Sequence, residues 1–126
     1  MTAPSRPAVA PSGAARPSLP WLTIRVTAIL LAVLVLAHYA ATHILVDVAE
    51  TGSAFIAERW ESGLIAATDW LMLVAGVLHG AAGAWIITGD YVRSPARLGR
   101  VRAAIGVLAA AMLAGGTATL LVVLGR

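Results

Sequence analysis

Apolar residues gather into three long runs in this chain, over residues 22–46, 64–88 and 101–124, and short polar segments separate them. A helix needs about 20 consecutive, mainly apolar residues to cross a bilayer, and each run is long enough. The pattern predicts an all-α integral membrane protein with three transmembrane helices. We expect Pro95 to mark where the second helix stops extending beyond its span.

The segment before the first run has a different composition. Residues 1–20 contain five of the six prolines, mixed with alanine and serine. They lack the apolar core of about 7 to 15 residues that a secretory signal needs. We therefore expect residues 1–20 to be a disordered tail and residues 21–126 to form a three-helix membrane anchor whose first apolar run is retained.

The overall composition supports a membrane protein. The chain is 60% hydrophobic and 12% charged, against about 25% charged residues in soluble domains. It has no cysteine, which excludes disulfides, thiolate metal sites, iron–sulfur ligation and covalent haem attachment through this chain. Any metal must therefore be held by histidine or carboxylate.

Charge is distributed unevenly between the connections. The segment after the first run is mainly acidic, whereas the second connection carries Arg93, Arg97, Arg100 and Arg102. The positive-inside rule places the N-terminus and the second connection in the cytoplasm, and the acidic connection and the C-terminus outside. The basic balance then reflects membrane topology, so we expect no nucleic-acid partner. Arginine without lysine and abundant alanine indicate a GC-rich bacterial genome, and we expect a multi-pass protein of the bacterial plasma membrane.

Aromatic and small residues fit this arrangement. Trp21, Trp60 and Trp85 lie near the predicted span ends, where interfacial anchors are expected. Glycines recur in the second and third runs, and small residues let helices or a flat cofactor approach the backbone closely. We expect a partner subunit.

His79 is the strongest functional candidate. It lies roughly 14 Å inside the hydrocarbon, where an ionisable side chain indicates a functional site. Gly80 and Gly83 follow it, leaving room for a porphyrin, and Asp90 lies eleven residues further, on the same helical stripe and roughly 16 Å along the axis. Two interpretations are open: a haem ligand, or a histidine that bonds a neighbouring helix.

The other two histidines lie on the first run. His38 and His43 are five residues apart, so in an α-helix they point roughly 140° away from each other and do not share a ligand field. His38 differs from His79 by about 10 Å in depth, which argues against a shared iron. His38 is either the ligand of a second, outer haem or a buried polar contact, and we expect His43 at the interface.

Asp90 and Tyr91 form a candidate quinone edge. A phenol can donate a hydrogen bond to a quinone carbonyl, and a carboxylate can relay protons. We expect Arg25 at the same level, where it either pairs with an anionic group or only marks topology. The alternative for the pair is an interfacial tyrosine beside a helix-terminal aspartate. Asp69 is expected to face a partner helix or the interface, without a catalytic role.

These residues resemble those of a known family, the small hydrophobic membrane anchors of succinate dehydrogenase (respiratory complex II), and among them the D-type anchor. The matching pattern is Leu78-His79-Gly80-Ala81-Ala82-Gly83 followed by Asp90-Tyr91, with Arg25 at the head of the first span. The segment with Phe55, Arg59, Trp60 and Asp69 is similar to actinobacterial members. The resemblance covers roughly residues 21–124.

The resemblance implies a role in electron transport and the tricarboxylic acid cycle. His79 would be an axial ligand of a b-type haem, with the second histidine supplied by the companion C-type anchor. Tyr91 would bond a quinone, menaquinone or ubiquinone, with Asp90 and Arg25 supporting that site or the haem propionates. His38 leaves the haem number at one or two.

The resemblance also implies partners. FAD and iron–sulfur clusters would lie in a flavoprotein subunit and an iron–sulfur subunit, so this chain is not catalytic alone. Two alternatives stay open: an anchor of fumarate reductase, and a haem-free structural membrane protein whose histidines only pack helices.

Overall fold

The computed structural model describes residues 18–47, 49 and 51–125. These residues form helix α1 (Leu19–Tyr39) with a π-helical turn η1 (Ala40–Ile44), a short α2 (Ser53–Trp60), and long helices α3 (Gly63–Tyr91) and α4 (Pro95–Leu124). The described part contains no strand, and three segments are long and apolar enough to cross a membrane: Leu19–Ile44, Gly63–Tyr91 and Pro95–Leu124. The prediction of an all-α membrane protein with three spans is confirmed. Most of the predicted tail, residues 1–17, lies outside the described residues.

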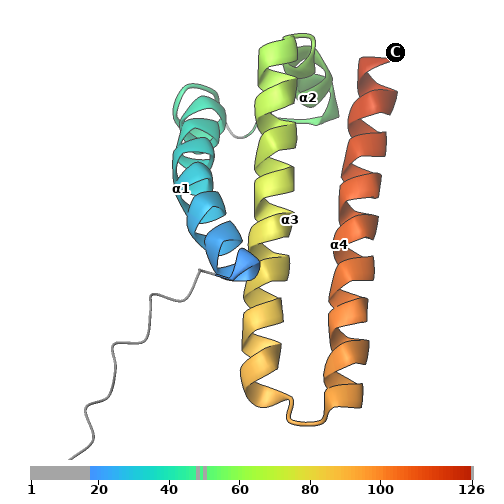
Figure 1. Cartoon of the computed structure of the whole chain (residues 1–126). Coiled ribbons are helices and arrows are strands. Elements are labelled where there is room, and N and C mark those ends of the chain that lie inside the picture. Colours follow the sequence, from blue (N-terminus) through green and yellow to red (C-terminus); the bar gives the residue numbers. More distant parts are fainter. Residues whose placement is uncertain (1–17, 48, 50, 126) are drawn as a thin grey trace, which may run out of the picture.

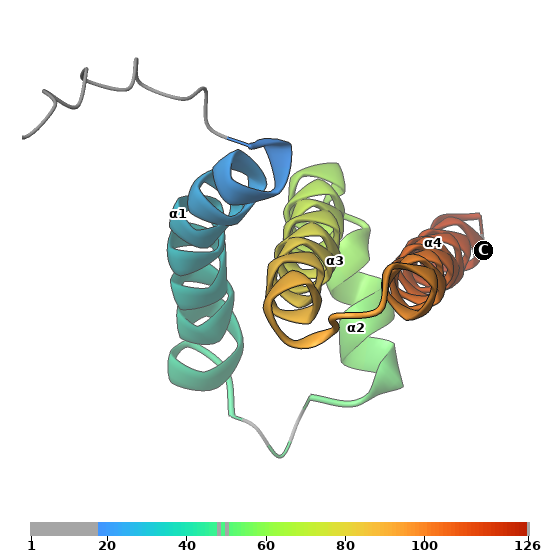
Figure 2. The same cartoon turned by 60° about the horizontal axis from the view of Figure 1, so that its bottom comes forward.

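The long helices lie side by side with α3 in the middle (Figure 1). Figure 2 shows α1 and α4 on opposite sides of α3, so that the helices form a single layer rather than a closed bundle. Helix α1 begins partway along α3, and the last turns of α3 extend beyond it to the α3–α4 turn (Figure 1). The short helix α2 lies at the opposite end.

Two helix boundaries differ from the predicted ones because of proline. Helix α1 begins at Leu19, inside the expected tail, with Pro20 in its first turn, where a missing N–H breaks no hydrogen bond. Pro95 does not end the second helix. It opens α4, whereas α3 ends at Tyr91 and Val92 adopts an extended conformation. The third membrane span, helix α4, therefore begins six residues before the predicted start at residue 101.

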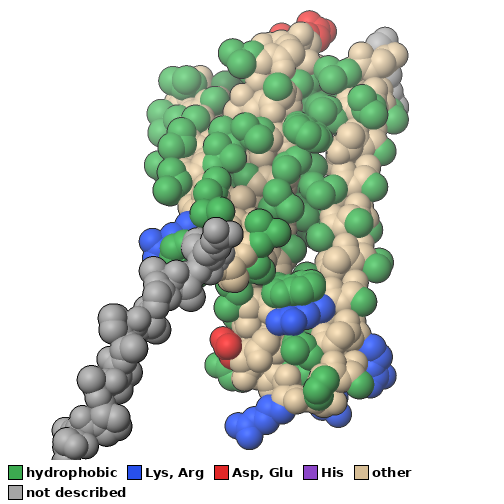
Figure 3. Space-filling view, in the orientation of Figure 1, with side chains coloured by type: hydrophobic (Ala, Val, Ile, Leu, Met, Phe, Trp, Pro, Cys, Tyr) green, Lys and Arg blue, Asp and Glu red, His purple; other side chains and the backbone are tan. Residues whose placement is uncertain are grey.

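Small side chains fill the interior of this layer. The buried apolar residues in the described part are Ala66, Ala75, Val77 and Ala82, all on α3. Large apolar side chains such as Ile29 are turned outward instead. Figure 3 shows these apolar side chains over the length of the helices, with arginines gathered near the α3–α4 turn. The exposed apolar surface fits contact with lipid and with partner helices. Which helix ends lie in the cytoplasm stays a prediction from the arginines.

Helices α3 and α4 pack closely at one point. A side chain at Gly116 would overlap the Leu73 side chain of α3. Next to it, Trp70 Nε1 donates a hydrogen bond of 3.0 Å to Thr117 Oγ1. The glycine thus allows the close approach that small residues provide in membrane helices.

Candidate functional site

His79 lies on α3 at its contact with α1. Its Nδ1 is 3.1 Å from the hydroxyl oxygen of Thr27, a buried residue of α1. In the described part of the chain this is the one side-chain hydrogen bond that His79 makes, and its imidazole is half-buried. The histidine does contact a neighbouring helix, and among the residues that the structure describes Nε2 has no hydrogen-bond partner.

The glycines next to His79 face two different helices. Gly83 lies one turn further along α3, and a side chain there would contact Ile24 of α1 at 4.0 Å. Gly80 instead lines a cavity of about 190 Å³ between α3 and α4 and has open space where a side chain would begin. That the two glycines leave room for a porphyrin stays a prediction. Gly83 shares the side of His79, and Gly80 does not.

Asp90 and Tyr91 are the last two residues of α3. Both are exposed, Tyr91 to 82%, and neither side chain makes a hydrogen bond or ion pair within the described residues. Since α3 extends beyond α1 here, a partner subunit can reach both side chains (Figure 1).

Arg25 is not at the level of this pair. The Thr27–His79 contact fixes how α1 lies along α3, and Asp90 is a further eleven residues away, about 16 Å. Arg25 lies close to Thr27 in sequence and stacks on Trp21, with its guanidinium carbon 4.6 Å from the ring centroid. The predicted common level is wrong because α1 begins partway along α3.

Arg102 of α4 lies close to this end of α3 instead. Its guanidinium stacks on Trp85, at 4.6 Å from the ring centroid, and a side chain at Gly89 would lie 3.1 Å from its Nη2. Its Nε is buried and has no hydrogen-bond partner in the part of the chain that the structure describes. Sequence reasoning treated Arg102 only as a topology marker. The missed signal is the pair Trp85 and Gly89, which lie four residues apart on one side of α3 before Asp90.

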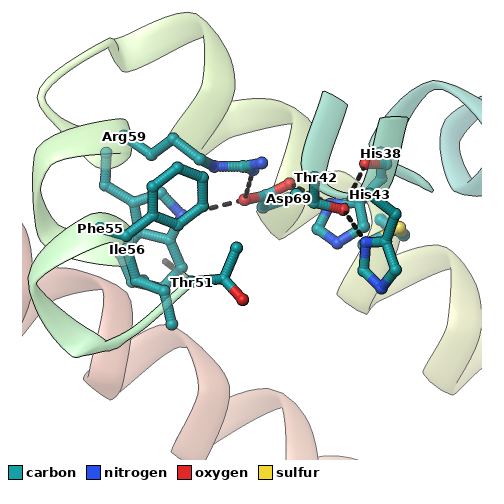
Figure 4. A pocket seen from close by; sticks show the side chains of 10 residues that line it. His38, Thr42, His43, Thr51, Phe55, Ile56, Arg59 and Asp69 are labelled. Atoms are coloured by element: carbon teal, nitrogen blue, oxygen red, sulfur yellow. Dashed lines mark hydrogen bonds and ion pairs between the residues drawn. The ribbon is translucent and has the colours of Figure 1, made fainter. Parts of the chain in front are cut away.

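A polar cluster joins α1, α2 and α3 at the opposite end. The carboxylate of Asp69 accepts hydrogen bonds from Arg59 at 2.6 Å and from Trp60 Nε1 at 2.9 Å, and its other oxygen lies 3.0 Å from His38 Nδ1 (Figure 4). Asp69 and Arg59 are each only 14% exposed. Asp69 therefore faces the neighbouring helices α1 and α2 of its own chain.

The π-helical turn brings His38 and His43 to one cavity. This turn has a hydrogen bond from Leu45 N to Ala40 O, five residues back, which is wider than an α-helical turn. The two histidines line the same cavity of about 360 Å³, although α-helical spacing predicts side chains that diverge by roughly 140°. Such turns are frequent at functional sites.

His38 and His79 lie at different levels, as predicted. His38 bonds Asp69, which precedes His79 by ten residues on α3, or about 15 Å along the axis. His43 Nδ1 bonds Thr42 Oγ1 at 2.7 Å. Within the described residues there is no group of three or more histidine, cysteine or acidic side chains that could hold a metal ion.

Comparison with protein families gives a match over residues 3–123. The family is the succinate dehydrogenase/fumarate reductase transmembrane subunit. The chain belongs to this family. A comparison with curated proteins finds no match.

Membership of the succinate dehydrogenase/fumarate reductase transmembrane family fits the fold. The chain is a multi-pass membrane subunit of a complex whose catalytic subunits are separate chains. The predicted resemblance is confirmed at the level of the family, and the D-type assignment and an actinobacterial origin stay predictions. His79, Asp90 and Tyr91 all lie within the matched range.

Proposed function

We propose that this chain is a D-type anchor that binds a b-type haem through His79 and contributes Asp90 and Tyr91 to a quinone site. The observation that carries the proposal is the His79 imidazole, which lies midway along an apolar helix and is bonded through Nδ1 alone within the described residues. Nε2 is then the nitrogen that can ligate iron.

The residues present fit a haem shared with a second membrane anchor. Imidazole is a common axial ligand of haem iron, and without cysteine the haem would be held non-covalently. This chain offers one imidazole at that level, so the second ligand would come from the companion C-type anchor. A haem in this position supplies one-electron transfer, while the protein contributes binding, orientation and electrostatics.

The quinone site would lie at the α3–α4 turn. The Tyr91 hydroxyl can donate a hydrogen bond to a quinone carbonyl, and the Asp90 carboxylate can hold and pass on a proton. Both side chains are exposed, which fits a site that other subunits complete. We assign the supporting cation to Arg102, which lies against Gly89, rather than to Arg25.

The partners follow from the same proposal. A flavoprotein with FAD and an iron–sulfur subunit dock on the side of the membrane where the arginines gather, and electrons pass from succinate to menaquinone or ubiquinone in the bacterial plasma membrane. The family includes fumarate reductases, so the reverse direction is the second candidate. Rates of succinate oxidation and fumarate reduction by the purified complex distinguish the two.

His38 is a candidate ligand of a second haem. Its Nδ1 bonds Asp69, and a carboxylate behind a ligating histidine fixes the ring and raises its basicity. Its ring lines the cavity of about 360 Å³. Two haems per copy of this chain in a pyridine haemochrome assay would support this role, and one would leave His38 as a polar contact.

The haem assignment is tested by His79→Ala in the copurified complex. We expect haem to be lost while the protein still inserts, because removing the side chain leaves no charge or unsatisfied donor in the helix. Val107→Ala is the control, since that side chain is 71% exposed and lies on α4, on the opposite side of α3 from α1 (Figure 2). Unchanged haem in His79→Ala would defeat the assignment.

The quinone assignment is tested by Tyr91→Phe. Only a hydroxyl is lost, so we expect normal haem content and quinone reduction slowed about 10-fold or more, which corresponds to one hydrogen bond of roughly 1.4 kcal/mol. Tyr39→Phe, at the opposite end of the helices, is the control. Wild-type quinone kinetics in Tyr91→Phe would move the site elsewhere.

A further inference from the structure

Two buried threonines of this chain each form a hydrogen bond with a histidine. Thr27 and Thr42, at 6% and 7% exposure, are the buried polar side chains among the described residues. Thr27 lies 3.1 Å from Nδ1 of His79, and Thr42 lies 2.7 Å from Nδ1 of His43. An interior made of alanine and valine thus buries two hydroxyl groups, and both contact imidazole rings.

The direction of the proton at Thr27 follows from its second contact. The Thr27 hydroxyl oxygen lies 2.6 Å from the backbone carbonyl oxygen of Thr23. Two oxygens approach this closely only with a proton between them, and a carbonyl cannot donate. The single hydroxyl proton of Thr27 therefore points to Thr23, and the hydroxyl can only accept a hydrogen bond from His79.

We infer that Thr27 is a positioning residue that fixes the tautomer and the ring orientation of His79. The Nδ1–H group of the imidazole donates to Thr27, and the lone pair is then on Nε2. Histidine binds a metal through such a lone pair, and the partner of its other nitrogen determines which nitrogen that is. The part of the inference that concerns haem rests on the proposed function. The tautomer of His79, in contrast, is a property of this chain alone.

The contact also links helix packing to the ligand. Thr27 is on α1 and His79 is on α3, so the orientation of the ring depends on how these helices lie against each other. A sliding or tilting of α1 would remove the acceptor from Nδ1 and free the ring to rotate.

The first test measures the tautomer without haem. The full chain is labelled with ¹⁵N-histidine, prepared without haem in lipid nanodiscs, and its imidazole nitrogens are observed by NMR. We expect His79 to be protonated at Nδ1 and not at Nε2 in the wild type and in Thr27→Ser, and to become a mixture in Thr27→Val. Thr42→Val is the matched control. It should change His43 and leave His79 as in the wild type.

The second test uses the copurified complex with haem. Loss of a partner behind a metal-bound histidine typically weakens metal binding by about 10- to 100-fold, and we expect this range for haem in Thr27→Val. The midpoint potential of the remaining haem should become more positive, because a less basic imidazole stabilises ferric iron less. Thr27→Ser should have the haem affinity and the midpoint potential of the wild type. A loss of packing in Thr27→Val would not by itself explain that result.

These outcomes separate the inference from the proposed function. A wild-type complex without haem would contradict the haem assignment, and the NMR result would still decide the role of Thr27. A wild-type His79 protonated at Nε2 would overturn the inference without any variant. So would a Thr27→Val protein whose His79 tautomer, haem affinity and potential equal those of Thr42→Val.

Discussion

Asp69→Asn should destabilise the end of the molecule where α2 packs on α3. The Asp69 carboxylate bonds Arg59 at 2.6 Å, and both side chains are 14% exposed, so the change leaves a largely buried guanidinium without its counter-charge. Breaking a buried ion pair costs about 3 to 5 kcal/mol, and an exposed pair contributes less than about 1 kcal/mol. The amide still accepts from Trp60, so we expect a loss of about 2 to 3 kcal/mol in the free energy of unfolding.

The assay is unfolding of the full chain in mixed micelles of increasing SDS content, with helix content as the signal. Glu58→Gln is the matched control, because it neutralises an exposed carboxylate of α2 beside Arg59. A double-mutant cycle with Arg59→Met then isolates the pair, and we expect a coupling free energy of about 1.5 to 3 kcal/mol. Equal effects of Asp69→Asn and Glu58→Gln, or a coupling near zero, would refute the reasoning.

Two further predictions concern the packing of α3 on α4. Gly116→Ala should cost about 1 kcal/mol in the same unfolding assay, because the new methyl group forces Leu73 off its rotamer, whereas Gly115→Ala has open space and should cost nothing. Equal stability of the two variants would contradict the close contact. Trp70→Phe removes the hydrogen bond to Thr117 and should cost about 0.6 kcal/mol, the average for such bonds between membrane helices. A Thr117→Val background should abolish the effect of Trp70→Phe, and an undiminished effect would argue against the bond.

The candidate site could be proposed from the sequence because its signals are local. His79 stands out as an imidazole in an apolar run, and Asp90-Tyr91 follows at a fixed helical spacing. The places of Arg25 and Arg102 were not recoverable in this way. Both are arginines near span ends, and their difference depends on where α1 and α4 lie along α3.

The geometry of His38 and His43 shows a second limit. Their spacing of five residues was interpreted with α-helical periodicity, which gives divergent side chains. The chain instead forms a π-helical turn at Ala40–Ile44, which the spacing of apolar residues does not predict. For Asp69 the sequence predicted a partner helix or the interface, and sequence spacing does not show that α2 folds back over it.

The sequence by itself determined the fold class, because the length of an apolar run and the cost of unpaired backbone groups in hydrocarbon leave helices as the spanning elements here. It also determined which ionisable groups lie within the apolar runs. Only the tertiary structure decided at which level along α3 the helix α1 lies. This level brings Thr27 to His79 and His38 to Asp69, and it keeps Arg25 away from Asp90. Contacts between helices depend on packing across the whole length of their surfaces. The spacing of residues within one helix does not determine that packing.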